Sequence, residues 1–173
     1  RLTVGLIPDL VHVAAEVVDD GPLFEGQAVG HPLLAADVRV ANDVSLTRAA
    51  TSLLLVSGSN MSGKSTLLRI VGTAAVLALA GATVRATRLR ISPLALGASL
   101  RVQDSLQEGA SRFFAELLCL RRVVALTSGG LPVLFLLDEI LQGTNVTERQ
   151  IAVRRVLGFL LEQGAIGAIS THD

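Results

Sequence analysis

A glycine-rich loop with a single lysine is the first stretch of this chain whose residue types and spacing could do chemistry. Residues 58–65 read GSNMSGKS and match G-x-x-x-x-G-K-[ST] at every fixed position. Glycines let successive backbone N–H groups turn toward phosphate oxygens, and the start of a following helix adds partial positive charge. Lys64, the only lysine in the chain, can then reach β- and γ-phosphates, while the Ser65 hydroxyl can ligate Mg²⁺. The alternative is a chance glycine turn, which the apolar run before the loop and the helical pattern after it disfavour.

Two adjacent acids end an apolar run that lies later in the chain. Residues 133–139 read VLFLLDE, which predicts a buried strand with a carboxylate pair at its end. Asp138 would hold Mg²⁺ through water, and Glu139 could orient or deprotonate an attacking water. Such a pair favours a hydrolase over a kinase, because a kinase activates an acceptor hydroxyl instead of water. A pair of capping or solvated carboxylates is the alternative.

His172 follows a third apolar run. Residues 165–170 read AIGAIS and precede Thr171, His172 and Asp173. Ligands of open α/β sheets bind at the carboxyl ends of the strands, so His172 is expected at the same crevice as the loop. A neutral imidazole there could donate to the γ-phosphate. Without that placement, His172 would be an ordinary surface residue.

The elements that must position these groups alternate between buried strands and helices. This pattern predicts an α/β fold, mostly a parallel sheet with helices on both faces, and short antiparallel strands near the N-terminus. The strands are expected within 24–34, 38–46, 52–58, 133–137 and 165–170. Helices are expected over 65–80, over 111–126 and between a Thr147–Gln150 capping box and Gly164, with a helical lead-in at 1–20 and a looser segment at 82–104.

Composition limits the classes of protein that remain. The chain has 173 residues, half of them apolar, and a formal net charge of zero, so we expect one core and no overall electrostatic attraction to nucleic acid or membrane. The uncharged run at 70–84 is shorter than the roughly 20 residues that cross a bilayer. Cys119, the single cysteine, indicates a reducing compartment and reads as a core residue. Arg85, Arg88 and Arg90 could contact a partner or DNA, although a solvated face is the simpler interpretation.

The motifs together resemble the ATPase domain of the MutS mismatch-repair family, an ABC-type P-loop ATPase. The resemblance extends over most of the chain after residue 20. It is carried by GHPLL (30–34), VANDVSL (40–46), SGSNMSGKST (57–66), DSLQEGAS (104–111), LLDEILQGTN (136–145) and STHD (170–173). Two departures, Gln142 and Asn145 where the family usually reads D-E-x-x-R-G-T-S, together with SRFFAEL at 111–117, indicate a divergent branch.

The resemblance implies a site for ATP and Mg²⁺ that is shared between two copies. Ser111 would face the γ-phosphate held by the other copy, although a simple helix-capping serine is the alternative. Gly143, Thr144 and Asn145 would lie at the interface, and His31 near the adenine or in a plain His-Pro turn. The expected nucleotide contacts are Gly58, Ser59, Asn60, Met61, Ser62, Gly63, Lys64, Ser65, Thr66, His31 and Ser111. The expected catalytic groups are Glu139, His172 and Lys64, and the expected metal ligands are Ser65 and Asp138.

The implied function is the ATP-binding and ATP-hydrolysing domain of a MutS-like DNA repair protein, acting as a dimeric, nucleotide-driven clamp switch on DNA. Residues 1–20 would lead in from a preceding domain, and 21–173 would form the ATPase domain, truncated at its C-terminus. DNA would be bound through other domains, no membrane would be involved, and the location would be cytoplasmic, at the nucleoid. Another ABC-type ATPase engine and a nucleotide switch that does not hydrolyse ATP are the alternatives.

Overall fold

The computed structural model describes residues 12–34, 40–59, 61–100 and 109–172. Within these ranges it contains ten strands, three α-helices and one short 3-10 helix. In chain order they are β1 (His12–Ala14), β2 (Glu16–Val17), β3 (Leu23–Val29), β4 (Asn42–Thr47), β5 (Leu53–Ser57), α1 (Lys64–Leu79), β6 (Thr83–Arg85), β7 (Arg88–Ile91), β8 (Ala95–Ser99), α2 (Gly109–Ala125), η1 (Leu126–Ser128), β9 (Val133–Asp138), α3 (Val146–Glu162) and β10 (Ile166–Thr171).

A parallel sheet in the order β5-β10-β9-β8 forms the centre of the described fold. Every residue of β9 is buried, and β10 is buried up to its last residue, as their continuous apolar runs predict. The register pairs Asp138 of β9 with Ser170 of β10. The prediction that residues 52–58 form a fully buried strand is wrong in one respect: β5 is an edge strand, and Leu55 is 60% exposed.

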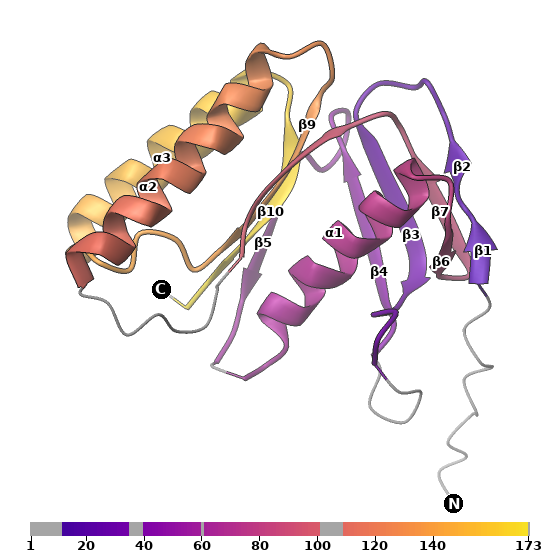
Figure 1. Cartoon of the computed structure of the whole chain (residues 1–173), viewed down its shortest axis with the longest axis horizontal. Helices are drawn as coiled ribbons and strands as arrows, with labels where there is room; N and C mark the ends of the chain where they lie inside the picture. The colour runs from indigo at the N-terminus through magenta and orange to yellow at the C-terminus, as the bar shows by residue number, and fades with distance from the viewer. Residues whose placement is uncertain (1–11, 35–39, 60, 101–108, 173) are drawn as a thin grey trace, which may run out of the picture.

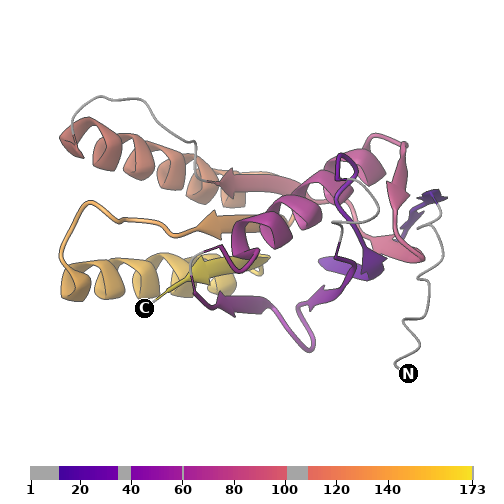
Figure 2. The same ribbon diagram turned by 90° about the horizontal axis from the view of Figure 1, so that it is seen from below.

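Helices cover both faces of this sheet, which confirms the predicted α/β class (Figure 1). On one face α1 lies between the parallel sheet and the antiparallel strands, and a single apolar cluster joins all three layers. On the other face α2 and α3 pack against β9 and β10 through a second cluster. Seen from below, the antiparallel strands lie at the opposite end of the molecule from α2 and α3 (Figure 2). No helix in the described part of the chain has the length and apolar character to cross a membrane.

The antiparallel strands predicted near the N-terminus are present, and they recruit more of the chain than the sequence pattern indicated. β3 pairs with β4 and with β7, while β2 adds to β7 and β1 pairs with β6. The segment at 82–104, expected to be loose, therefore contributes β6, β7 and β8. The predicted helix at 1–20 is wrong for its described part, because residues 12–17 form two strands paired with partners about 70 residues away; residues 1–11 lie outside the described chain.

The helix boundaries follow local signals closely, with one correction. The α1 C-terminus is followed by Gly81 at φ +75°, and α3 is followed by Gly164 at φ +77°, the left-handed conformation that ends many helices. The predicted Thr147–Gln150 capping box is wrong by two residues. Asn145 is the N-cap of α3, and its side chain accepts a hydrogen bond from the Glu148 backbone N–H at 2.9 Å.

Candidate functional site

The residue types singled out in the sequence come together at one edge of the molecule. In Figure 1 the first turns of α1, α2 and α3 lie at the same end as the carboxyl ends of β5, β9 and β10. This follows from the parallel order of the strands, because β5, β8 and β9 are followed in the chain by α1, α2 and α3, and β10 ends at the same edge. The loop at 58–65, the acid pair and His172 each follow one of these three strands.

The loop at 58–65 is closed around the Lys64 ammonium group. Lys64 is the first residue of α1, is buried, and donates to the backbone oxygens of Gly58 at 2.8 Å and Ser59 at 2.9 Å. Gly63 precedes it at φ +88°, which glycine adopts without strain. A Cβ on Gly58 would lie 2.9 Å from the Ser62 hydroxyl oxygen. Tight backbone curvature at both glycines therefore creates the concave loop that the motif predicts, whereas Asn60 lies outside the described residues.

The start of α1 is suited to an anion. Its first turn contains no acidic residue, and its N-cap, Gly63, makes no side-chain capping hydrogen bond. The helix dipole and the free N–H groups therefore favour negative charge at this position. Ser65 and Thr66 lie half-buried in this turn, and Met61 is exposed in the loop with φ +64°.

The Glu139 side chain contacts both Lys64 of the loop and His172, which follows β10. Its Oε1 lies 3.7 Å from the Lys64 Nζ and 3.2 Å from the His172 Nδ1. The side chains of Lys64 and Glu139 are each 6% exposed, so the two opposite charges compensate one another in a site from which water is largely excluded. Because a carboxylate only accepts hydrogen bonds, this contact favours the tautomer with the hydrogen on the His172 Nδ1. The structure thus brings together all three predicted catalytic groups.

Asp138 supplies a buried oxygen that no described residue satisfies. Its Oδ1 accepts a 2.5 Å hydrogen bond from the Ser170 hydroxyl, while its Oδ2 is buried and meets no hydrogen-bond donor among the described residues. A buried orphan oxygen calls for an ion or a bound water. Mg²⁺ fits this position because it commonly binds through one or two carboxylates and substrate phosphates, retaining several waters.

Backbone strain marks the loop after β9. Glu139 and Leu141 have φ values of +45° and +60°, which residues other than glycine rarely adopt. The Glu139 N–H is held at 3.2 Å by both the carbonyl and the hydroxyl oxygen of Ser170. Strained conformations of this kind occur at functional sites, where surrounding contacts enforce them. The hydroxyl of Ser170 was not recognised in the sequence as part of the site, since its role depends on the strand register.

The residues that the resemblance assigns to a shared interface are placed less completely. Ser111 lies in the first turn of α2, but its side chain is outside what the structure describes. Gly143 packs against the same helix, since a Cβ there would lie 3.0 Å from that of Phe113. The Thr144 hydroxyl donates to Glu148 at 2.6 Å, and Asn145 caps α3.

His31, the residue expected near the adenine, forms a local turn. Its Nδ1 accepts from the Leu33 N–H at 3.2 Å, and its carbonyl accepts from the Leu34 N–H at 3.3 Å. This geometry is the His-Pro turn that the sequence allowed. A contact with adenine stays a prediction.

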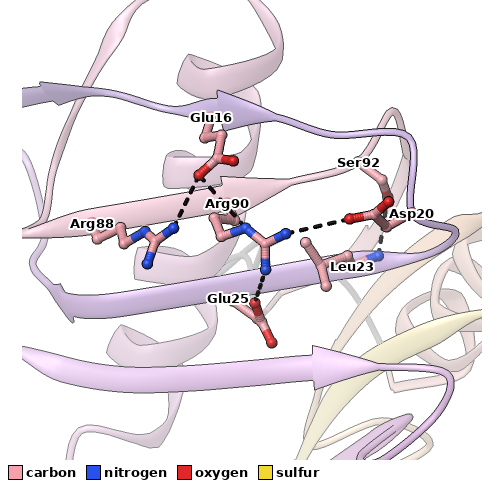
Figure 3. A network of polar contacts seen from close by, with 7 residues as sticks. All are labelled: Glu16, Asp20, Leu23, Glu25, Arg88, Arg90 and Ser92. Carbon is pink, nitrogen blue, oxygen red and sulfur yellow. Dashed lines mark hydrogen bonds and ion pairs between the residues drawn. The ribbon is translucent and has the colours of Figure 1, made fainter.

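The arginine cluster of β6 and β7 is paired with side chains of the N-terminal segment and β3. Figure 3 shows the Arg90 guanidinium between three carboxylates: Nη1 lies 2.9 Å from Glu25, Nη2 3.3 Å from Asp20 and Nε 3.6 Å from Glu16. Arg88 also contacts Glu16, at 3.2 Å. The charges are therefore largely balanced within the protein, and a DNA contact by these arginines stays untested.

A cleft of about 390 Å³ opens on the same antiparallel sheet. It is lined by Glu25, Gly26, Gln27, Asp43, Val44, Ser45, Arg88 and Arg90. None of the residues predicted to bind nucleotide or metal lines it, so this cleft is separate from the candidate site.

Comparison with known proteins places the same segments in one family. Residues 54–173 match the family model described as MutS domain V, a range that contains the loop, the acid pair and His172. A DNA mismatch repair protein MSH6 of Arabidopsis thaliana is 34% identical over 168 residues, which are 92% of this chain and 12% of that protein. An endonuclease MutS2 of Thermus thermophilus is 33% identical over 177 residues, 97% of this chain and 23% of that protein.

A DNA mismatch repair protein MutS of Brevibacillus brevis is 31% identical over 169 residues, 95% of this chain and 19% of that protein. The chain thus spans between 12% and 23% of the length of these three relatives. The domain V match covers more than two thirds of the residues and includes each strand end at which the site is built. The chain belongs to the MutS family.

Proposed function

We propose that this chain binds ATP with Mg²⁺ and hydrolyses it, as the nucleotide-driven part of a MutS-type DNA repair protein. The observation that carries the proposal is the meeting of four groups with complementary roles at one sheet edge. Lys64 is within ion-pair distance of Glu139, and His172 contacts the same carboxylate. Asp138 precedes Glu139 and has a buried oxygen that receives no hydrogen bond from the described residues. A cation, a candidate base and a metal ligand in one dehydrated site are the components of phosphoryl transfer to water.

The resting arrangement implies an exchange of partners when nucleotide binds. In this structure Lys64 donates hydrogen bonds to two loop carbonyls and forms an ion pair with Glu139. Phosphate oxygens would take the place of Glu139 beside the ammonium group, and Glu139 would then hold an attacking water and accept its proton. When bound, Mg²⁺ would neutralise phosphate charge and leave the phosphorus open to attack. Asp138 would hold that ion, directly or through water, with help from the Ser65 hydroxyl.

In this proposal His172 orients Glu139 instead of acting as a simple phosphate donor. A neutral imidazole carries one N–H, and the 3.2 Å contact between the His172 Nδ1 and the Glu139 Oε1 favours Nδ1 as its position. Donation from Nε2 to a phosphate would therefore require the doubly protonated ring, or release of Glu139. This refines the expectation that a neutral His172 contacts the γ-phosphate.

We further propose that two copies form the complete site, with Ser111 of each acting on nucleotide held by the other. Support comes from the outer face of α2, whose N-terminus lies at the edge that carries the site (Figure 1). Phe114, Leu117 and Leu118 are exposed on this helix at positions i, i+3 and i+4, which share one side. Neighbouring exposed apolar side chains of this kind are suited to contact with a second copy of the chain. DNA would be engaged by other parts of the full-length protein.

The decisive experiment measures ATP binding and phosphate release by the chain in the presence of Mg²⁺. Glu139→Gln removes the base while keeping the shape of the side chain, so we expect binding to persist and turnover to fall by about 10²–10⁴-fold. Glu162→Gln is the matched control, because Glu162 is exposed at the end of α3 and should leave turnover unchanged.

Two results would contradict the proposal in different ways. If Glu139→Gln and the unchanged chain release phosphate at the same rate, Glu139 does not activate water. If the folded chain binds no ATP in calorimetry with Mg²⁺ present, the entire functional assignment is wrong. Binding without any turnover would instead identify a switch that assembles on ATP and does not hydrolyse it.

A further inference from the structure

The hydroxyl of Ser170 contacts both acidic residues of the site. Ser170 is 1% exposed and lies on β10 directly opposite Asp138 in the register with β9. Its hydroxyl donates to the Asp138 Oδ1 at 2.5 Å and accepts from the Glu139 backbone N–H at 3.2 Å. Its carbonyl accepts from the same N–H at 3.2 Å. One buried side chain therefore bridges two strands and two consecutive carboxylate-bearing residues.

For Asp138, the contact holds the carboxylate in place and occupies one of its two oxygens. A serine hydroxyl has one hydrogen, and Oδ1 receives it. The rotation of the carboxylate is thereby restricted, and Oδ2 becomes the oxygen left without a donor among the described residues. Asp138 is 3% exposed, so this oxygen cannot be satisfied by bulk solvent. The Asp138 Oδ2 is therefore oriented to bind a metal ion, or a water molecule held by a metal ion.

The consequence for Glu139 is a backbone held in a strained conformation. The left-handed φ of +45° costs free energy for a residue other than glycine and persists only when neighbouring contacts enforce it. Two acceptor oxygens of Ser170 surround the single N–H of Glu139. With its backbone in this conformation, the Glu139 side chain contacts Lys64 and His172.

We propose that Ser170 is a positioning residue that presents Asp138 to the nucleotide-bound Mg²⁺ and sets the backbone of Glu139. This inference rests on the proposed function, because it assigns a role within the same ATP·Mg²⁺ site. It goes beyond the motif-based assignment, in which position 170 has no task. Groups that orient a metal ligand typically change metal affinity by about 10–100-fold when they are removed.

The test compares the Mg²⁺ dependence of nucleotide binding in three forms of the chain. Calorimetry with the β,γ-imido analogue of ATP, at a series of Mg²⁺ concentrations and in EDTA, separates metal-dependent from metal-free affinity. For Ser170→Ala we expect the Mg²⁺ concentration at half-saturation to rise by about tenfold or more, with binding in EDTA unchanged. Ser170→Thr, which retains the hydroxyl, should restore the original value.

Ser92→Ala provides the matched control. Ser92 is 3% exposed, and its hydroxyl accepts from the Leu23 backbone N–H at 3.0 Å, so this variant also loses a buried serine hydrogen bond. It should lower the thermal midpoint by roughly 2–4 °C, comparably to Ser170→Ala, without altering the Mg²⁺ dependence. If Ser170→Ala does not fold, Ser170→Cys, which is nearly the same size and a poorer hydrogen-bond donor, is judged by the same criterion.

The outcomes separate the two proposals. An unchanged Mg²⁺ dependence in Ser170→Ala, or an equal shift in Ser92→Ala, overturns the role of Ser170 while the ATP site stands. Failure of the unchanged, folded chain to bind the analogue at any Mg²⁺ concentration overturns the proposed function itself.

Discussion

Gly167 tests how tightly the two strands that carry the site are held together. It is buried on β10 opposite Phe135 of β9. A Cβ at this position would lie 2.2 Å from the Phe135 carbonyl oxygen and 2.5 Å from two carbons of its ring. The obstacle is the backbone of a strand that is paired on both sides, so it cannot turn away as a flexible side chain would. For Gly167→Ala the strands must separate locally by about 1 Å to restore ordinary contact.

The cost can be worked from these contacts. Overpacking a filled core costs about 1–3 kcal/mol, and a clash with backbone lies at the upper end because ladder hydrogen bonds also lengthen. We therefore expect Gly167→Ala to lower the free energy of unfolding by about 3 kcal/mol. For a chain of this size that corresponds to a thermal midpoint lower by roughly 6–12 °C.

Gly158→Ala is the matched control with the opposite expected sign. Gly158 lies inside α3, and a Cβ there would meet nothing within 4 Å. Alanine should stabilise the helix by about 0.5–1 kcal/mol. Urea and thermal unfolding must be followed by far-ultraviolet circular dichroism, because the chain has no tryptophan or tyrosine. If Gly167→Ala changes stability by less than about 0.5 kcal/mol, the close pairing of β9 and β10 described here is refuted.

Three further predictions concern the capping of α3, the loop and the arginine cluster. Asn145→Ala should destabilise the chain by about 1 kcal/mol in urea unfolding, because the N-cap hydrogen bond to Glu148 is lost, and Asn145→Asp should keep most of the stability. Gly58→Ala should weaken ATP binding about tenfold in calorimetry with little change in unfolding, since the new Cβ conflicts with the Ser62 hydroxyl at a φ of +155° that disfavours alanine; equal affinities would refute the loop geometry. Arg90→Gln should lower the free energy of unfolding by about 1 kcal/mol at low ionic strength, and this loss should be smaller in roughly 0.5 M NaCl because salt screens the ion pairs. A loss that does not depend on salt would mean that Arg90 stabilises the protein through packing and not through its charge.

The sequence was sufficient to predict three of the four strands of the central sheet, and the meeting of the candidate-site groups at one sheet edge, because those signals are local. The runs at β9 and β10 are apolar without interruption, which indicates strands covered on both faces. The loop motif fixes its own backbone through glycine and presents Lys64 at the start of a helix. Once the strands are parallel, the acids after β9 and the histidine after β10 must lie near that loop.

The features that were missed depend on partners far along the chain. β1 and β2 are three and two residues long, and they exist because β6 and β7 offer them an edge. β7 alternates exposed or half-exposed arginines with buried Leu89 and Ile91, which is the two-residue period of a strand. The alternation covers only four residues, and the two arginines made the segment read as a solvent-exposed loop. The contact between Ser170 and Asp138 spans 32 positions and requires the register of two strands. No pattern within one segment contains that information.

The position of α1 between two sheets has a thermodynamic consequence. The amide groups in the middle of the helix are expected to exchange with solvent mainly when the larger of the two apolar clusters of the described residues comes apart, because that cluster joins the helix to both sheets. A ligand gripped at the first turn of this helix would therefore stabilise the cooperative unit as a whole, in proportion to the logarithm of its free concentration. If a core substitution far from the site lowers the amount of ligand bound, the first explanation to test is therefore that fewer molecules are folded. A lower intrinsic affinity of the folded site is the second.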